Sequence, residues 1–347
     1  MITGNQKTHR VNDAQSICNM WFYWQGRWSF LPGFRKKRNM AENNNHPISE
    51  SENKEKTSDR RKSIFYLCLT IFCALGLVIV LGIMVSDYVG KTKHQEYYAK
   101  LAEENIQREN IPTEDTQTNQ EETESEPEDI LSKLGISIPE KQIDWDALQQ
   151  ENEDIYAWIY IPGTVIDYPI VQHPTDNEYY VNHNLDGSKG RPATIMTQNY
   201  NTKTFLDLNT LVYGHNMRNG TMFRGLHEFE DEEFFDTYRY VYIYLPDTVY
   251  VYEIFAEYTF GNELITVCYD FTSTEGFQKY LDVVFSYQDK NGQFREGMNI
   301  TTVNHLLTLS TCTTPTDYDY RYLVQCVLLN DPTLTEDQIM RTVYSIQ

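Results

Sequence analysis

The sequence predicts a mainly β protein: a closed β-barrel with peripheral helices, preceded by one transmembrane helix and an acidic stalk. Residues 64–85 form a run of 22 residues without a charge. An acidic segment that is poor in apolar residues follows and extends to about residue 139. Residues 140–347 contain short stretches in which apolar and polar positions alternate, which is typical of half-buried strands. A closed barrel leaves few sheet edges exposed, so it fits these strands best.

The charge of the chain is spread unevenly along its length. The 347 residues include 29 Lys and Arg against 50 Asp and Glu, a net charge of −21. Residues 1–63 have 12 basic against 6 acidic residues, whereas residues 64–347 have 17 against 44. An acidic body repels phosphate backbones, which disfavours nucleic-acid binding. The six cysteines are too few and too scattered for a disulfide framework or a zinc site, and we expect no metal and no cofactor.

The apolar run from Ile64 to Val85 is long enough to cross a membrane. As a helix it would measure roughly 33 Å, against about 30 Å for the hydrocarbon core of a bilayer. It exceeds the apolar core of a signal peptide, and no small-residue cleavage pattern follows it. Arg60, Arg61 and Lys62 precede it, so the positive-inside rule places the N-terminus in the cytoplasm and the C-terminal part outside the cell membrane.

The predicted organisation has four segments. Residues 1–63 form a basic cytoplasmic segment, in which Met40 is an alternative start, and residues 64–85 form the transmembrane anchor. Residues 86–139 are rich in Glu, Thr and Gln and cannot bury enough apolar surface to order themselves, so they predict a flexible acidic stalk with some helix near residues 97–107. Residues 140–347 form the extracellular catalytic domain.

The catalytic domain opens with a short helix and continues mainly as strands. Apolar residues at 143, 148 and 155 predict the helix, and the sequence WIYIPG after them predicts a strand. Residues 238–244 alternate with Tyr at every second position, and Pro246 to Thr248 separate them from a second strand, which indicates a hairpin. Residues 273–288 have the apolar spacing of a helix, and the chain then returns to strands that contain TLSTC and YLVQCVLL.

Three residues at strand ends carry the candidate chemistry. Cys312 ends an apolar strand, and Arg321 begins the next strand nine residues later, so a hairpin can bring the guanidinium back to the thiol. His215 ends another apolar stretch in LVYGHN. A His and an Arg near a Cys favour the thiolate, and together they can perform acyl transfer. The alternatives are ordinary: a buried Cys312, a surface ion pair of Arg321, and a turn position for His215.

Several separated motifs resemble the sortases, extracellular cysteine transpeptidases of Gram-positive bacteria. They are TLSTC with a following Arg and GHNMRNGTMFRGL around His215. The opening segment DWDALQQENEDIYAWIYIPGTVIDYPIVQ and the helix at 273–288 resemble the class B group, and the likeness extends from about Asp144 to Leu329. The resemblance implies a closed sortase-type barrel, in which residues 263–299 include the wall of the substrate groove.

The resemblance also implies a reaction. Cys312 would attack a C-terminal sorting motif of a secreted protein and form a thioacyl enzyme. His215 would serve as general acid and base, and Arg321 would hold the substrate and stabilise the oxyanion. The acceptor would be an amine of a peptidoglycan precursor, so the product would be a protein fixed to the cell wall. Ser310 and Thr311 are weaker candidates for substrate binding, because packing explains them equally well.

Other readings of the same residues remain open. A pilin-polymerising sortase would use the lysine amine of another protein, a hydrolytic cysteine protease would use water, and an inactive binding module would do neither. The remaining histidines of the domain are expected to be structural or solvent-facing, and two further cysteines to be packing residues: His173, His183, His227, His305, Cys268 and Cys326. No motif matches the calcium site known in class A sortases.

Overall fold

The computed structural model describes residues 48–107, 129–288, 290, 292–316 and 319–344. Most of the predicted basic segment, including Met40, and the central part of the predicted stalk lie outside these residues. The described chain divides into a helical unit that ends at Lys93 and a second unit that begins at His94. The second unit contains all the candidate site residues.

One long helix, α2 (Ile48–Asn105), contains the whole apolar run. Residues 64–86 on this helix are exposed to solvent, as expected for a surface that packs against lipid. Among the described residues it is the one helix that is long and apolar enough to span a membrane, by length and composition alone. The helix continues past Val85, so residues 86–105, which the sequence assigned to a flexible stalk, are helical.

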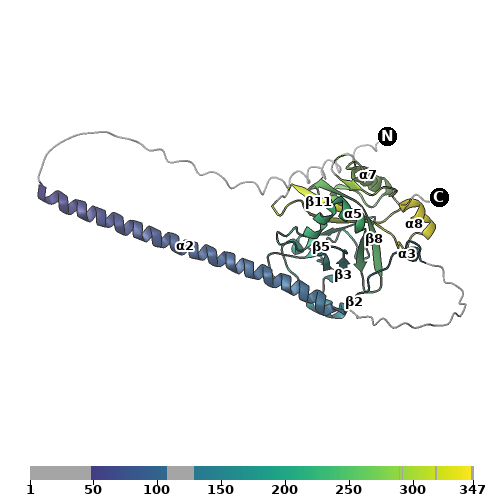
Figure 1. Cartoon of the computed structure of the whole chain (residues 1–347), viewed down its shortest axis with the longest axis horizontal. Coiled ribbons are helices and arrows are strands. Elements are labelled where there is room, and N and C mark those ends of the chain that lie inside the picture. Colours follow the sequence, from purple (N-terminus) through teal and green to yellow (C-terminus); the bar gives the residue numbers. More distant parts are fainter. Residues whose placement is uncertain (1–47, 108–128, 289, 291, 317–318, 345–347) are drawn as a thin grey trace, which may run out of the picture. The chain divides into compact units, whose positions relative to one another are not determined.

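The second unit is a closed β-barrel, as predicted (Figure 1). Eight strands follow one another in the order β11, β10, β6, β5, β4, β3, β7 and β8, and β8 then pairs with β11 to close the ring. Their bounds are β3 Ile155–Tyr160, β4 Asp167–Val171, β5 Ile195–Thr197, β6 Asn209–Tyr213, β7 Tyr240–Tyr244, β8 Val249–Gly261, β10 Leu306–Cys312 and β11 Tyr320–Leu328. Strand β9 (Gln293–Phe294) adds to β8 outside the ring.

Short helices and one small ladder lie around the barrel. The helices are α3 Ile130–Lys133, α4 Trp145–Glu151, α5 Glu232–Thr237, α6 Ile265–Cys268, α7 Thr274–Phe285 and α8 Glu336–Val343, with 3-10 helices η2 Tyr179–Val181 and η3 Phe223–Glu230. Strands β1 (Ile106–Gln107) and β2 (Gln142–Ile143) form the ladder. The predicted opening helix, hairpin and helix at 273–288 correspond to α4, to β7 with β8, and to α7.

The core fills the barrel with large apolar side chains. Trp158 on β3 is fully buried, and its indole N–H donates to Asp167 Oδ1 at 2.6 Å, so the polar edge of the ring is satisfied. The core also extends further toward the N-terminus than the expected boundary at residue 140. Tyr98, Ile130 and Leu131 are buried, and the hydroxyl of Tyr98 donates to the carbonyl of Ala193 at 2.6 Å.

Candidate active site

Cys312 lies at the end of a strand that is otherwise buried. Strand β10 runs between β6 and β11, and its residues from Leu306 to Thr311 are all buried. Cys312 is the last residue of the strand and is partly exposed. The two neighbouring strands hold the backbone in place, while the strand's end leaves the thiol within reach of a ligand. This arrangement suits a nucleophile that must be rigid and accessible.

Arg321 lies directly opposite Cys312. Strands β10 and β11 are antiparallel, and their register pairs Leu306 with Val327 at one end and Cys312 with Arg321 at the other. Side chains of directly opposed residues point to the same face, with Cβ atoms about 4.5–5.5 Å apart. The expectation that the hairpin returns Arg321 to Cys312 is therefore confirmed. The guanidinium also donates from Nη1 to the carbonyl of Tyr320 at 3.0 Å.

His215 approaches Cys312 from the other side. Strand β6 runs parallel to β10, and their register pairs Asn209 with Leu306 and Tyr213 with Ser310. The ladder continues beyond β6, because Gly214 N–H donates to the carbonyl of Ser310 at 3.1 Å. The same register, extended by two residues, sets His215 level with Cys312. The ends of three neighbouring strands thus place the backbones of His215, Cys312 and Arg321 side by side. These three residues form the row.

The residue before His215 has to be a glycine. A Cβ atom at Gly214 would lie 2.5 Å from the side chain of Ile195 and 2.6 Å from that of Phe223. Both neighbours are fully buried, so neither can move aside at low cost. After His215 the chain turns back, and Phe223 N–H donates to the carbonyl of His215 at 3.0 Å. The backbone of His215 is therefore fixed on both sides.

The surroundings of His215 favour the neutral form of its ring at pH 7. Burial, the positive charge of Arg191 and, more weakly, that of Arg321 lower its pKa to about 4. A hydrogen bond opposes these effects without cancelling them: Nε2 lies 2.7 Å from the carbonyl of Val181 at the end of η2. Because a carbonyl only accepts, Nε2 carries the proton, and Nδ1 holds the lone pair of the neutral ring.

The lowered pKa bears on the role expected of His215 as general acid and base. A pKa of about 4 favours the neutral imidazole, which is a base. A neutral imidazole can take the thiol proton as the sulfur attacks, and it then becomes the acid that the next step needs. Arg321, paired with Cys312 across the hairpin, adds a fixed positive charge to this end of the barrel. A thiol, an imidazole and a guanidinium are residue types suited to nucleophilic acyl transfer.

Comparison with known proteins agrees with this geometry. A family model described as the sortase domain matches residues 159–329. Sortase B of Listeria monocytogenes is 36% identical over 172 residues, which cover 50% of this chain and 68% of that protein. The chain belongs to the class B sortases. Sortase B of Staphylococcus aureus is 26% identical over 168 residues, covering 48% of this chain and 67% of that protein.

Solved class B sortases share the fold. The crystal structure of sortase B from Bacillus anthracis in complex with AAEK1 superimposes with a TM-score of 0.51 at 28% identity. The match covers 70% of this chain and 98% of that one. Because it spans almost the whole of the solved domain, the barrel described here is the sortase barrel, and the chain is a cysteine transpeptidase by family.

Ser310 and Thr311, the two weaker candidates for substrate binding, lie on opposite faces of β10. Ser310 shares the face of Cys312, because residues two apart on a strand point the same way, whereas Thr311 points to the opposite face. Both side chains are buried, and Thr311 Oγ1 has no hydrogen-bond partner in the described part of the chain. Of the two, Ser310 is therefore the one on the face of the thiol. The described residues contain no group of three or more His, Cys, Asp or Glu side chains that could hold a metal.

Several residues that lie around His215 and Cys312 were not predicted from the sequence to act at the site. Arg191 acts on the pKa of His215 from a loop that no motif singled out. Asn216, directly after His215, donates to the carbonyl of Cys312 at 2.9 Å. His227, expected to be structural or solvent-facing, is buried, with Nε2 at 3.1 Å from the same carbonyl. In the sequence, the one sign that His227 has a partner is its spacing from Glu230, which lies three residues later on η3.

Proposed function

We propose that this sortase cleaves a C-terminal sorting motif of secreted proteins and transfers the acyl group to an amine of a peptidoglycan precursor. The observation that carries the proposal is the register across β6, β10 and β11, which aligns His215, Cys312 and Arg321. Family membership supports the reaction type. The polar groups of the row match the three needs of acyl transfer: a nucleophile, a proton carrier and a cation for the oxyanion.

The first half of the reaction forms a thioester. The sulfur of Cys312 attacks the carbonyl carbon of the scissile peptide bond, and Nδ1 of neutral His215 accepts the thiol proton. Negative charge develops on the carbonyl oxygen, where the guanidinium of Arg321 stabilises it. His215 then protonates the departing nitrogen, the C–N bond breaks, and the C-terminal fragment leaves as an amine. The N-terminal fragment remains on the sulfur as a thioester.

The second half repeats these roles in reverse. The acceptor amine attacks the thioester carbonyl, and His215 takes a proton from its nitrogen. The C–S bond breaks as the new peptide bond forms, and His215 returns the proton to the sulfur. One peptide bond is broken and one is formed, so the acyl energy is conserved and no nucleotide is required.

We further propose that α2 anchors the enzyme in the cell membrane as a single pass, with the catalytic domain outside and the N-terminus in the cytoplasm. The uncharged run Ile64–Val85 and the basic residues Arg60 to Lys62 before it support this orientation. Secreted proteins and wall precursors meet on the outer face, so this side is where the reaction needs the enzyme.

A peptide assay tests the catalytic proposal. The full-length protein in detergent micelles is incubated with quenched fluorescent sorting-motif peptides, with and without an amine acceptor. We expect cleavage by the wild type and by Cys268→Ala, a matched control at an exposed cysteine, and none by Cys312→Ala. Mass spectrometry should find the amine adduct. Cleavage that survives Cys312→Ala would contradict the proposal, and a product with water alone would indicate a hydrolase.

The acceptor is tested in the same assay. Peptidoglycan-stem peptides and a lysine-containing pilin peptide are supplied in competition at equal concentration. We expect the adduct to form with the stem amine, and a preference for the pilin lysine would identify a pilin-polymerising sortase instead.

Labelling of intact cells tests the orientation. A membrane-impermeant maleimide should label Cys268 in cells that express Cys312→Ala, because Cys268 lies on the proposed outer side and is exposed. The Cys268→Ala, Cys312→Ala double variant is the control. Labelling of Cys268 only after lysis would place the domain in the cytoplasm.

A further inference from the structure

A buried polar cluster lies behind the nucleophile, away from the row of His215, Cys312 and Arg321. Its centre is His227 on η3, whose ring stacks on Tyr322 of β11 with the ring centroids 4.5 Å apart. His227 Nδ1 lies 2.6 Å from Glu230 Oε1, and Nε2 lies 3.1 Å from the carbonyl oxygen of Cys312. The side chain of Asn216 lies between these groups.

Asn216 connects the two catalytic backbones. Its Nδ2 lies 2.9 Å from the Cys312 carbonyl and 2.9 Å from Nε2 of His227, with the Thr313 carbonyl further away at 3.4 Å. Its own backbone directly follows His215. One amide therefore ties the loop that carries His215 to the strand end that carries Cys312.

His227 completes this connection through both ring nitrogens. The Glu230 carboxylate accepts from Nδ1, so Nδ1 carries a proton. The Asn216 amide only donates from Nδ2, so the Nε2 lone pair accepts one of its hydrogens and directs the other to the Cys312 carbonyl. A side chain without nitrogen atoms cannot accept this hydrogen bond.

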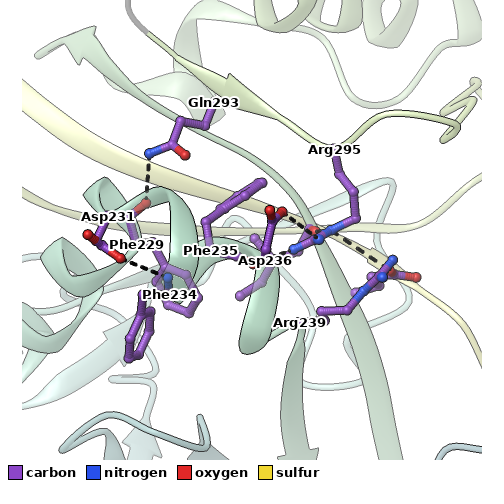
Figure 2. Close-up of polar contacts among 10 residues, drawn as sticks. Phe229, Asp231, Phe234, Phe235, Asp236, Arg239, Gln293 and Arg295 are labelled. Carbon is purple, nitrogen blue, oxygen red and sulfur yellow. Dashed lines mark hydrogen bonds and ion pairs between the residues drawn. The ribbon is translucent and has the colours of Figure 1, made fainter.

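The surroundings keep η3 in place. Gln293 on β9 donates to the carbonyl of Phe229 at 3.1 Å (Figure 2). It also donates to the carbonyl of Glu230 at 2.9 Å, and the two bonds hold the end of η3. Behind the ring, Glu257 lies on the neighbouring strand β8, and burial raises the pKa of its carboxyl. His227 is thus held by its stacking on β11, by Glu230 and by the strands behind η3.

We propose that His227 is a positioning residue for the nucleophile: with Glu230 and Asn216 it forms a clamp that holds the Cys312 carbonyl and sets the spacing between Cys312 and His215. His227 and Asn216 are buried behind Cys312, so the clamp acts on the chemical step and not on binding. This inference rests on the proposed function only for its kinetic consequence. The clamp itself concerns the position and reactivity of the thiol.

Two pairs of variants test the clamp in the full-length protein. His227→Phe keeps an aromatic ring for the stack on Tyr322 but has no nitrogen, whereas His227→Gln can both donate and accept. Glu230→Leu removes the acceptor for Nδ1, whereas Glu230→Gln keeps one. The side chain of Glu230 is 58% exposed, so neither substitution at this position endangers folding.

The kinetic readout separates positioning from binding. We expect kcat with a sorting peptide to fall about tenfold in His227→Phe, on the order of one lost hydrogen bond to the nucleophile's peptide group. KM should stay within about twofold, because no substrate contact changes. His227→Gln and Glu230→Gln should recover to within about threefold of the wild type, and Glu230→Leu should resemble His227→Phe.

A second readout needs no sorting peptide. Iodoacetamide is added, and the alkylation of the peptides that contain Cys312 and Cys268 is followed by mass spectrometry in the same sample. We expect the ratio of the Cys312 rate to the Cys268 rate to fall several-fold in His227→Phe and Glu230→Leu and to be restored in the two Gln variants. This ratio decides the clamp even if the proposed transpeptidation is not observed.

Two results would overturn the inference. One is an unchanged Cys312 to Cys268 ratio in Glu230→Leu and in a folded His227→Phe. The other is an equal loss in the Phe and Gln variants at position 227 while Glu230→Leu behaves as wild type, because a size effect and not a hydrogen bond would then explain the change.

Discussion

The side chain of His215 lies in surroundings that disfavour its charged form. Burial and the charge of Arg191 lower its pKa from 6.5 to about 4. Since one pKa unit corresponds to about 1.4 kcal/mol, a shift of this size disfavours the imidazolium by on the order of 3 kcal/mol relative to a solvated histidine. At pH 7 the substrate-free enzyme should therefore hold His215 almost entirely neutral.

An NMR titration measures this pKa directly. The full-length protein is labelled at histidine Cε1, and the resonance of His215 is assigned by its absence in His215→Gln. We expect its midpoint near pH 4 while the fold persists, or no titration above pH 5. A midpoint near 6.5 would refute the reasoning, because it would show that neither burial nor Arg191 acts on the ring.

The same shift has a consequence for stability. The unfolded chain binds a proton at His215 below about pH 6.5, but the folded chain does so only below about pH 4. The wild type should therefore lose stability between these values as the pH falls, whereas His215→Gln lacks this contribution. Thermal midpoints of both proteins at pH 7 and pH 5 give the comparison. An equal decrease in the two proteins would contradict the assigned shift.

Further predictions concern the guanidinium groups and the core. Arg191→Gln should raise the pKa of His215 only part of the way toward 6.5, because burial, the larger cause, remains; an unchanged NMR midpoint would exclude Arg191 as a cause. Arg321→Gln should lower kcat about 10²–10³-fold in the peptide assay, the usual effect of losing an oxyanion donor, and Arg321→Lys should lose less because it keeps the charge. Trp158→Ala should destabilise the barrel by about 3–5 kcal/mol and lower the thermal midpoint by roughly 6 °C or more, since the side chain is fully buried. Tyr98→Phe should cost about 1 kcal/mol through the lost bond to Ala193, and an unchanged midpoint would show that this end of α2 does not stabilise the domain.

The sequence predicted the barrel because its strands have simple patterns. The alternation in residues 238–244 and the apolar run before Cys312 each correspond to a strand, and the spacing in 273–288 corresponds to α7. The order of the strands in the ring could not be read from these patterns, because it depends on pairings between segments far apart in the chain. The helix expected near residues 97–107 corresponds to the end of α2, but its continuity with the apolar run was not predicted, since a polar composition does not exclude a helix that packs through Tyr98.

The site was predictable where its residues lie at strand ends. Cys312, Arg321 and His215 each stand where an apolar stretch meets a loop; the register pairs Cys312 with Arg321, and His215 follows two residues after the last paired residue of β6. The protonation state of His215 was not predictable, because it depends on Arg191 and on burial by residues distant in sequence. The role proposed for His227 was hidden for the same reason: its partners lie on three other segments of the chain.

The most direct test of the account is to trap the acyl group on the enzyme. The full-length protein is mixed with an intact sorting peptide that it cleaves, in the absence of an acceptor amine. The reaction is quenched with acid within seconds, and the protein is digested and examined by mass spectrometry. The account predicts a peptide containing Cys312 that carries the mass of the N-terminal fragment as a thioester and disappears when an amine is added before the quench. Turnover with no adduct on Cys312, or with the adduct on another residue, would contradict it.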